Sequence, residues 1–468
     1  MVPKHEGCER VKKNSDKIAV VAVAARCAGA DDVDEFENLL DSCRPQFCEA
    51  PPSRWQDPSV PLAEFPDALW KSYSNVMAPI SDPYELDGFQ FRIPLPRLKR
   101  MDPQQRLVIN LAAQLFGGVD EEHMRRGETA TVIGVSSTDY RGIAAWPVMN
   151  QMMLGLSRET LSPSTAQDLA EAESRIEPTG AHSMPGVMTN MIATCVASAF
   201  DLTGPAFTID AACASGLAAV DIGCLLLRSR RVDSCVAGGV YVALTPEPLV
   251  GFSAVGAVSP SGRCVPFEQS ADGFVLGEGA GLVLLKRLDD ALADGDDVLC
   301  VIDGVGSSND GRASGVMTPT REGQVKAVRD AWAQAGLPLD TVDAIEAHGT
   351  GTVVGDAIEL EAISEVFGTS GRRVPIGSLK AIVGHTMAAA GVLSLIKVVL
   401  AVRRGTWFSQ PSPGPGSWNE RLDRDAFYLP TGLEPVAPVR RAAMNSFGFG
   451  GTNYHAILSS LEAVHDPA

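Results

Sequence analysis

The sequence has little positive charge and few histidine or aromatic side chains. It contains 39 Lys and Arg against 57 Asp and Glu, a formal net charge of −18, and only seven histidines and 6% aromatic residues. A chain this acidic repels phosphate backbones, which excludes nucleic acid as a general partner. Charged residues make up 21% and hydrophobic residues 45% of the 468 positions, which predicts a globular protein with a large core.

Paired cysteine motifs and long hydrophobic runs are also missing. The ten cysteines never form Cys-x-x-Cys and most lie inside apolar runs, which predicts reduced thiols in a cytoplasmic protein. The longest apolar helical stretch, 391–402, contains Lys397 and is too short to cross a bilayer. We interpret the early apolar run at 18–25 as a buried strand and not as a secretion signal, because acidic residues precede it and it is short and β-branched.

Short apolar runs alternate with helical patterns along the whole chain, which is typical of layered α/β architecture. Two groups of five expected strands are separated near Gly295, which indicates a duplicated unit. We therefore predict a loose polar tail at 1–17, a first half at 18–295 and a second half at 296–460. The expected strands are 18–24, 130–135, 206–209, 234–240 and 282–286, then 298–305, 344–347, 374–379, 442–446 and 454–458.

Residues 149–191 interrupt this alternation and are rich in Met, Ser, Thr and Pro. We interpret the segment as an insertion that caps the core of the first half. Because Met side chains adapt to irregular shapes, its methionines are suited to line a tunnel for an apolar chain, and equally to ordinary core or interface packing. The methionines concerned are Met149, Met152, Met153, Met184, Met188 and Met191.

Three turns each join a reactive side chain to the end of an expected strand. Cys213 follows the third strand of the first half, in a turn of Ala, Ser and Gly that precedes a helical run. Small residues let a bulky electrophile approach, and unpaired N–H groups at a helix start favour the thiolate. His348 and His385 close the second and third strands of the second half. We expect the Cys213 and His385 turns to be related by a pseudo-twofold axis and to converge on one site.

Four motifs, in order, resemble those of the β-ketoacyl synthases of the thiolase superfamily. Further blocks at 101–106, 260–267 and 271–280 are most similar to ketosynthase domains of type I polyketide synthases, iterative ones included. The resemblance implies a five-layered αβαβα fold of two pseudo-twofold-related halves with mixed five-stranded sheets. The four motifs are Asp210-Ala-Ala-Cys213-Ala-Ser, Glu346-Ala-His348-Gly-Thr-Gly-Thr352, Lys380-x4-His385 and Asn445-Ser-Phe-Gly-Phe-Gly-Gly-Thr-Asn453.

The resemblance also implies the catalytic roles. Cys213 accepts an acyl chain as a thioester, as a thiolate that is both nucleophile and leaving group. His348 and His385 stabilise the enolate that forms when a malonyl thioester loses carbon dioxide. Lys380 sets the local field, and Glu359 matches the family's partner carboxylate for that lysine, so we expect the two to pair. No metal and no bound cofactor are required.

By the same resemblance, the backbone N–H groups of Cys213 and Phe449 form an oxyanion hole. The glycine-rich loop around Phe449 is able to present its amides inward and to move, so Phe449 is a candidate gate. Thr350 and Thr352 carry hydroxyls that suit the amides of a phosphopantetheine arm. Asn445 and Asn453 are expected to hold the loop.

The implied activity is that of an acyltransferase, a β-ketoacyl-[acyl carrier protein] synthase that condenses a Cys-bound acyl chain with malonyl-carrier protein in polyketide or polyketide-like fatty acid biosynthesis. The implied partners are acyl carrier protein, a second copy bound through the strand at 206–209, and other domains of a synthase. The alternative is a non-elongating, gatekeeping or chain-length-determining homologue. Such homologues generally lack the cysteine or a histidine, so the presence of Cys213, His348 and His385 favours catalysis.

Other polar residues near these motifs have simpler interpretations. His455 lies in an alternating strand, and Glu278 has no evident chemical role, so we interpret both as structural. The turn Ala-Cys-Ala-Ser-Gly replaces the Ala-Cys-Ser-Ser-Ser of many polyketide ketosynthases, a change that reshapes the acyl pocket without altering the mechanism. An acidic carrier needs a basic patch, and the helix-end arginines are candidates, although such residues are more often solvated caps. These arginines are Arg228, Arg230, Arg231, Arg403 and Arg404.

Overall fold

The computed structural model describes residues 17–52, 54, 71–117, 128–156, 162–174, 176–312, 315, 318–368, 371–412, 414–432, 436 and 438–465. The predicted tail at 1–17 lies outside these residues except for Lys17. Within them, no helix combines the length and the apolar character that a bilayer crossing needs. The nine cysteines of the described part are all free.

The ten predicted strands are all present. Those of the first half are β1 (Ile18–Cys27), β4 (Thr129–Gly134), β5 (Ala206–Ile209), β6 (Ser234–Tyr241) and β8 (Gly279–Arg287). Those of the second half are β9 (Cys300–Asn309), β10 (Ala344–Glu346), β11 (Val374–Gly377), β13 (Arg441–Gly448) and β14 (Thr452–Ser459). Most are buried along their length, because helices cover both faces of each sheet.

The two halves have the same strand order and the same strand directions. In the first half the order is β5-β4-β6-β8-β1, and in the second it is β11-β10-β13-β14-β9. In each half three strands run parallel and the fourth pairs antiparallel with its neighbours on both sides. This repetition confirms the predicted pseudo-twofold fold. The halves join where Ile18–Val20 of β1 pairs with β9, and the short β12 (Phe427–Tyr428) extends the second half.

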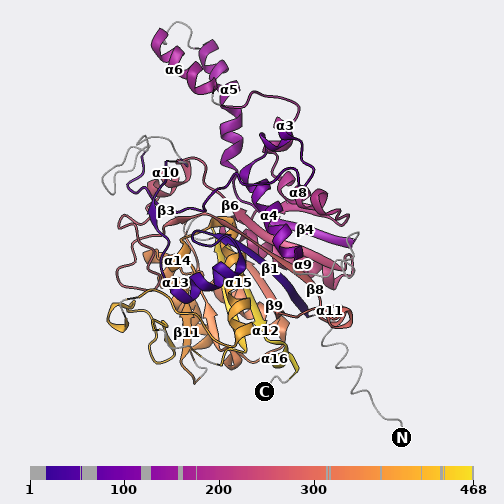
Figure 1. The fold of residues 1–468 in the computed structure, drawn as a ribbon. Coiled ribbons are helices and arrows are strands. Elements are labelled where there is room, and N and C mark those ends of the chain that lie inside the picture. Colours follow the sequence, from indigo (N-terminus) through magenta and orange to yellow (C-terminus); the bar gives the residue numbers. More distant parts are fainter. Residues whose placement is uncertain are drawn as a thin grey trace.

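The large sheet is continuous through the pair of β1 and β9, and helices form three layers around its two halves (Figure 1). The outer layer of the first half holds α4 (Pro103–Gly117) and α8 (Asn190–Phe200), and that of the second holds α12 (Arg321–Ala335) and α13 (Val353–Phe367). Between the sheets lie α9 (Ser215–Arg228) and α15 (Ala390–Arg404). Every residue of α15 from Ala390 to Val402 is buried, as its all-round apolar sequence predicted.

The two central helices cross at a pair of glycines. A Cβ atom on Gly216 of α9 would lie 2.8 Å from the carbonyl oxygen of Ala388 and 3.0 Å from the backbone nitrogen of Val392. Reciprocally, a Cβ on Gly391 of α15 would lie 3.0 Å from the backbone nitrogen of Leu217. The crossing therefore depends on glycine in both helices, which places both helix starts at the centre of the molecule.

The remaining elements are shorter or lie at the periphery. A small sheet contains β2 (Cys48–Glu49), β3 (Val76–Ala78) and β7 (Leu276–Gly277). The other helices are α2 (Val33–Ser42), α3 (Leu95–Leu98), α5 (Asp139–Leu156), α6 (Pro163–Ser174), α7 (Ser183–Val187), α10 (Glu247–Ala254), α11 (Leu288–Asp294), α14 (Lys380–Val383) and α16 (Leu461–His465). Single 3-10 turns are η2 (Ala212–Ala214), η3 (Leu339–Thr341), η4 (Met387–Ala389) and η5 (Pro415–Ser417).

Only the end of the insertion at 149–191 lies on the core, where the carbonyls of Pro185 and Gly186 accept hydrogen bonds from Gln105 of α4. In Figure 1, α5 and α6 project away from the layered body. The described side chains of Met149, Met152, Met184 and Met188 are exposed and line no tunnel. Met191 is half-buried and packs with Met101, Ile109 and Cys195, as the alternative of ordinary packing predicts. The side chain of Met153 lies outside the described part. The physical reason is visible in α6, which has no buried residue and therefore no apolar face to lay on the core.

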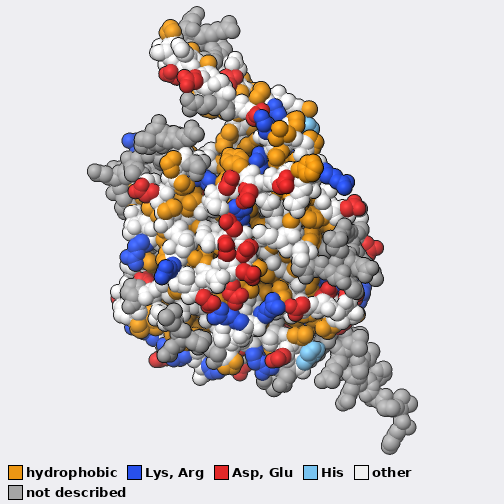
Figure 2. Space-filling view, viewed as in Figure 1, with side chains coloured by type: hydrophobic (Ala, Val, Ile, Leu, Met, Phe, Trp, Pro, Cys, Tyr) orange, Lys and Arg blue, Asp and Glu red, His pale blue; other side chains and the backbone are white. Residues whose placement is uncertain are grey.

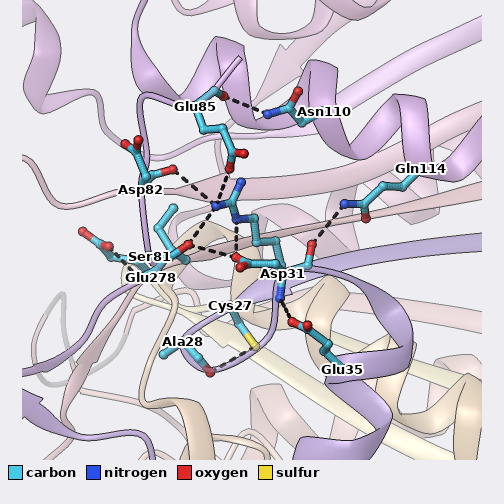
Figure 3. Close-up of polar contacts among 12 residues, drawn as sticks. Cys27, Ala28, Asp31, Glu35, Ser81, Asp82, Glu85, Asn110, Gln114 and Glu278 are labelled. Carbon is cyan, nitrogen blue, oxygen red and sulfur yellow. Dashed lines mark hydrogen bonds and ion pairs between the residues drawn. The ribbon is translucent and has the colours of Figure 1, made fainter. Parts of the chain in front are cut away.

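A buried arginine fixes the end of β1 (Figure 3). Nη2 of Arg26 donates to Ser81 Oγ at 2.9 Å and to Glu85 Oε2 at 3.0 Å, and its Nε lies 2.9 Å from Asp31 Oδ1. The carboxylates of Asp31 and Glu85 are more than half exposed. Figure 2 shows many acidic side chains down the middle of the face that it draws. This face is unsuited to an acidic partner.

Glu278 has a structural role, as predicted. Its carboxylate, fully buried between β7 and β8, accepts hydrogen bonds from the guanidinium of Arg54 and from the backbone N–H groups of Ile80 and Ala243. One buried carboxylate thus ties together three segments of the first half.

Candidate active site

Cys213 lies in η2, between the edge strand β5 and the start of α9. The preceding residue, Ala212, has a φ of 51°, a left-handed conformation that non-glycine residues rarely adopt. Hydrogen bonds hold this strained turn: the Ala212 N–H donates to Asp210 Oδ1 at 2.9 Å, and Ser215 Oγ donates to the Ala212 carbonyl at 2.6 Å. The turn is a nucleophile elbow that presents the thiol at the helix start.

The backbone N–H groups of Phe449 and of Cys213 itself favour the thiolate form of the Cys213 sulfur. These are the two amides predicted to form the oxyanion hole. Burial raises the pKa of Cys213 to about 11, although Lys380 and the two amides act in the opposite direction. The sequence-based expectation of a low-pKa thiolate is therefore wrong for the free protein, because desolvation outweighs the helix start and the lysine.

His348 follows β10 in a loop whose shape is fixed by two carboxylates of α13. Glu359 accepts the backbone N–H groups of His348 and Gly349, both at 2.7 Å. Asp356 accepts the N–H of Gly351 at 3.0 Å, and burial raises the pKa of Asp356 to about 7. Gly349 and Gly351 have φ values of 39° and 75°, which favour glycine and let the chain turn sharply around the imidazole.

His385 lies beyond α14, in the connection between β11 and η4. Its backbone N–H donates to the carbonyl of Val275 at 2.7 Å, and its carbonyl accepts the N–H of Gly277 at 3.0 Å, so the segment adds to β7 like a further strand. A Cβ on Gly384, whose φ is 68°, would lie 2.6 Å from the Val275 carbonyl. Main-chain pairing therefore determines where this imidazole lies.

The pseudo-twofold counterpart of Cys213 is Ala388 and not His385. Both η2 and η4 begin with a non-glycine residue of positive φ, Ala212 at 51° and Met387 at 44°, and each is followed by a central helix. Cys213 and Ala388 occupy the second position of these turns. The prediction that the Cys213 and His385 turns are symmetry mates is thus wrong by three residues, although both turns do meet at one site.

One cavity of about 360 Å³ collects the predicted reactive groups. Cys213, His348 and His385 all line it, together with Thr350, Thr352, Glu359 and Phe449. The imidazole rings of His348 and His385 stand edge to face with centroids 5.5 Å apart. Burial, and next Lys380, lower the pKa of both imidazoles well below the usual value, so both are neutral at neutral pH. Within the described part of the chain, Nδ1 of each ring is buried and has no hydrogen-bond partner.

Aromatic rings make the cavity wall apolar. His385 stands edge to face on Phe274 at 5.2 Å between centroids, and the ring of Phe449 lies 5.8 Å from that of Phe252. Phe449 is 38% exposed at the mouth, and the glycines after it have φ values of 90° and 78°. Asn453 holds this loop as predicted, because its Nδ2 donates to Asp310 Oδ1 at 2.7 Å and to the Gly451 carbonyl at 3.1 Å.

Lys380 and Glu359 do not form the expected ion pair. Both are buried and described, yet no contact of 4.0 Å or less joins Lys380 Nζ to a Glu359 oxygen. Burial lowers the pKa of Lys380, and Glu346 opposes this most strongly, followed by Glu359. Glu359 is occupied instead by backbone N–H groups and by Nδ2 of Asn445 at 2.8 Å.

Sequence reasoning missed a buried relay behind His348. The indole N–H of Trp332 donates to His455 Nε2 at 3.2 Å, so the proton of this neutral ring is on Nδ1, which donates to Asn445 Oδ1 at 2.7 Å. Asn445 in turn donates to Glu359. Burial lowers the pKa of His455 to about 3, in line with its predicted structural role. Asn445 thus positions Glu359 rather than the Phe449 loop.

Thr350 and Thr352 lie at the mouth of the cavity. Their hydroxyls are 3.0 Å apart, and the next two residues, Val353 and Val354, are exposed at the start of α13. The two threonines are therefore accessible from solvent and from the cavity. Among the described residues, no group of three or more His, Cys, Asp or Glu side chains is arranged to hold a metal ion.

Two of the arginines considered for a basic patch are already paired. Nη2 of Arg403 lies 3.0 Å from Oδ2 of Asp297, and Nη1 of Arg404 lies 2.9 Å from Oδ1 of Asp41. Their charges are partly neutralised, which agrees with a role as solvated helix-end residues.

Comparisons with known proteins agree with this geometry. The model of the β-ketoacyl synthase N-terminal domain matches residues 15–291, and that of the C-terminal domain matches 299–412. A phenolphthiocerol/phthiocerol polyketide synthase of Mycobacterium tuberculosis is 34% identical over 454 residues, which cover 95% of this chain and 27% of that protein. Phthioceranic/hydroxyphthioceranic acid synthase of Mycobacterium bovis is 36% identical over 457 residues, which cover 94% of this chain and 20% of that protein. The chain thus spans only 20–27% of the length of these relatives.

Solved structures show the same likeness. The ketosynthase from module 6 of the bacillaene synthase of Bacillus subtilis has a TM-score of 0.80 and 30% identity, with 95% of this chain and 72% of that chain covered. The oxazolomycin ketosynthase domain of Streptomyces albus has a TM-score of 0.81 and 31% identity, with 95% of this chain and 75% of that chain covered. The chain therefore belongs to the β-ketoacyl synthase family, and within it is similar to the ketosynthase domains of polyketide synthases.

Proposed function

We propose that the protein is an elongating acyltransferase, a β-ketoacyl-[acyl carrier protein] synthase of polyketide or polyketide-like fatty acid biosynthesis. The observation that carries this proposal is the common cavity of Cys213, His348 and His385, to which three distant segments contribute. The catalytic set is Cys213, His348 and His385, with Lys380 and Glu359 acting behind the imidazoles.

In the first step an acyl group moves from the phosphopantetheine thiol of a carrier to Cys213. The Cys213 sulfur attacks the thioester carbonyl, and the backbone N–H groups of Cys213 and Phe449 donate to the oxygen that becomes negative. The carrier thiolate leaves and takes up the proton lost by Cys213. The step is thus neutral in protons, which suits a thiol whose pKa burial raises to about 11.

In the second step a malonyl thioester in the same cavity loses carbon dioxide. The electron pair of the broken C–C bond forms an enolate, whose oxygen accepts hydrogen bonds from the ring N–H groups of His348 and His385. The low pKa of both imidazoles keeps them neutral, so each retains one N–H to donate. The positive charge of Lys380 further stabilises the enolate.

In the third step the enolate carbon attacks the acyl carbonyl on Cys213. The new C–C bond forms, the oxyanion again faces the N–H groups of Cys213 and Phe449, and collapse expels the Cys213 thiolate, which takes up one proton. The product is a β-ketoacyl thioester on the carrier. Phe449 gates the mouth, and Thr350 and Thr352 bond the phosphopantetheine amides there. No metal or bound cofactor is needed, since the substrates arrive on the carrier's arm.

We further propose that the protein is a cytoplasmic homodimer that binds acyl carrier protein and works beside other synthase domains. The free cysteines support the reducing compartment. The strand β5 supports the dimer, because it pairs with β4 on one side only and forms the edge of the sheet immediately before the nucleophile elbow. The relatives, which are polyketide synthases several times longer than this chain, support neighbouring domains.

Intact-mass spectrometry tests the function against the non-elongating alternative. The protein is incubated with acyl-carrier thioesters of several chain lengths and then with malonyl-carrier. An elongating synthase gains the acyl mass and loses it when malonyl-carrier releases carbon dioxide. Acyl mass that persists after malonyl-carrier is added, without carbon dioxide, supports a non-elongating homologue and contradicts the proposal. Failure to gain acyl mass from any thioester contradicts both.

A further inference from the structure

A buried ion pair lies directly behind the active site and takes no part in the reaction described above. Glu346 is the last residue of β10, two residues before His348, and Lys397 lies in the middle of α15. Glu346 Oε2 accepts a hydrogen bond from Lys397 Nζ at 2.6 Å, and the two side chains are at most 1% exposed. Neither residue lines the cavity.

The Glu346 carboxylate connects three elements of the site. Its Oε1 accepts the backbone N–H of Leu379 at 2.7 Å and the hydroxyl of Ser394 at 3.1 Å. Leu379 immediately precedes Lys380, and Ser394 is one turn before Lys397 on α15. One side chain thus joins the strand before His348, the turn that carries Lys380 and the central helix.

Stability alone does not explain this pair. A buried ion pair pays a desolvation cost that its attraction often fails to exceed, and well-packed apolar side chains are frequently as stable. Besides this pair, Lys397 Nζ lies 5.4 Å from the centroid of the Trp407 ring, a weaker cation–π contact. The surrounding helix is apolar on every side, so two apolar residues would fit this environment.

The pair lies within a charge cluster centred on Lys380. Glu346 has the largest charge effect on Lys380 and opposes the effect of burial on its pKa. Lys380 in turn lowers the pKa of the two imidazoles and of the nucleophile. The groups that act on Lys380 or respond to it are Glu346 of β10, Asp356 and Glu359 of α13, Cys213 of η2, Cys264, His348 and His385.

We infer that Glu346, held by Lys397, is a positioning residue for the condensation: it fixes the Lys380 turn against the His348 strand and supplies the countercharge that keeps Lys380 protonated. Lys397 holds the carboxylate in this orientation and prevents it from turning towards Lys380. The inference rests on the proposed function, because it assigns Glu346 a role in the decarboxylation step.

The test is the pH dependence of carbon dioxide release from malonyl-pantetheine by acyl-loaded protein. In Glu346→Gln the amide oxygen still accepts the Leu379 N–H, but the negative charge is lost. The pKa of Lys380 then falls further, and its protonated form is lost at lower pH. We expect the alkaline limb of kcat/KM to move down by about one pH unit or more, and the rate at any pH above the wild-type limb to fall by about tenfold.

Glu278→Gln is the matched control, because it removes a carboxylate from another buried ion pair, with Arg54, that is not among the charges acting on Lys380. It should lower the melting temperature and leave the alkaline limb in place. Should Glu346→Gln fold poorly, the double variant Glu346→Gln/Lys397→Met leaves no uncompensated buried charge. It should show the same downward shift, because Lys397 is not among the principal charges acting on Lys380.

If the alkaline limb of kcat/KM stays in place in Glu346→Gln or in the double variant, and only the melting temperature falls, the inference is overturned and the proposed function remains intact. Absence of carbon dioxide release from acyl-loaded wild-type protein overturns both.

Discussion

The two symmetry-related elbows of this fold differ in one added segment. In the first half, two residues, Asp210 and Ala211, separate β5 from η2. In the second half, nine residues, 378–386, separate β11 from η4. Everything after these connections is repeated: a positive φ, a 3-10 turn, a central helix and a glycine at the helix crossing.

The difference shows how a duplicated scaffold acquires two kinds of chemistry. The shared turn carries a thiol in one half and the methyl group of Ala388 in the other. Lys380 and His385 come from the added segment, which folds as α14 and is held by main-chain bonds to β7 and by Glu346. The fold itself therefore dictates the position of the nucleophile, whereas specific hydrogen bonds dictate that of the imidazole.

The largest expected effect comes from removing the Cys213 thiol, which the turn of the first half carries. Cys213→Ala should abolish acyl-enzyme formation, because no other described cysteine lies in the cavity. Intact mass after incubation with an acyl-carrier thioester measures this. Cys224→Ala, in the buried part of α9, is the control and should still gain the acyl mass. An acyl adduct that persists on Cys213→Ala contradicts the assignment of the nucleophile.

Removing the His385 imidazole should affect decarboxylation more than acyl loading, unlike the loss of Cys213. His385→Ala should retain most of the acyl loading and lower carbon dioxide release by about 10²–10³-fold, the usual cost of one oxyanion donor. Loading by mass and release of labelled carbon dioxide are compared on one preparation. Carbon dioxide release at the wild-type rate would contradict the role of His385 and leave that of Cys213 standing.

The repeated glycine crossing predicts matched losses of stability. Gly216→Ala and Gly391→Ala should each lower the free energy of unfolding by about 1–3 kcal/mol, because the added methyl group meets backbone atoms of the facing helix. Gly251→Ala in α10, where a Cβ meets nothing within 4 Å, is the control and should be neutral or stabilise by about 0.5–1 kcal/mol. Denaturant titration measures all three. A loss in only one of the two crossing variants would show that the halves are not equivalent here.

The rate of alkylation of Cys213 should reveal the effect of the Lys380 charge on this thiol. Because the thiol is protonated below a pKa of about 11, its rate of reaction with iodoacetamide should rise steadily from pH 7 towards pH 11. Lys380→Met removes a charge that lowers this pKa, so the profile should move to higher pH. Mass spectrometry of the Cys213 peptide measures the rate. A profile that is flat above pH 7 would contradict the raised pKa.

The smallest effect is expected for Phe449, at the mouth of the cavity. Phe449→Ala keeps the backbone N–H that faces the Cys213 sulfur but removes the ring from the cavity mouth. The ratio of kcat/KM values for long and short acyl thioesters should change by less than about tenfold, while the rate of decarboxylation stays near that of the wild type. An unchanged ratio would show that the loop is passive.

Much of this architecture could be predicted from the sequence. The ten strands follow from short apolar runs such as 18–24 and 234–240, because strands buried between helices need apolar residues on both faces. The shared cavity of Cys213, His348 and His385 followed from the family motifs around them. The symmetry mate of Cys213 was misassigned, although Ala-Cys-Ala-Ser-Gly-Leu and Met-Ala-Ala-Ala-Gly-Val both carry the glycine of the helix crossing at their fifth position, which was the available signal.

Contacts between charges were harder to predict. The expected pairing of Lys380 with Glu359 is absent, and Glu346 pairs with Lys397, 51 residues away. Neither outcome follows from sequence spacing. The pairing of Glu346 with Lys397 depends on how α15 packs against β10, and the separation of Lys380 from Glu359 depends on how α14 lies relative to α13. The pKa of Cys213 was expected to be low from its helix start, but burial, which no local pattern encodes, decides its direction.

A single turnover tests most directly whether the two elbows act together. Wild-type protein carrying one acyl group on Cys213 is mixed with malonyl-carrier, and acyl-enzyme, carbon dioxide and β-ketoacyl-carrier are measured over time. The account predicts that acyl-enzyme disappears as β-ketoacyl-carrier and carbon dioxide appear in equal amounts. Carbon dioxide released while the acyl group remains on Cys213 and no extended chain forms would contradict it.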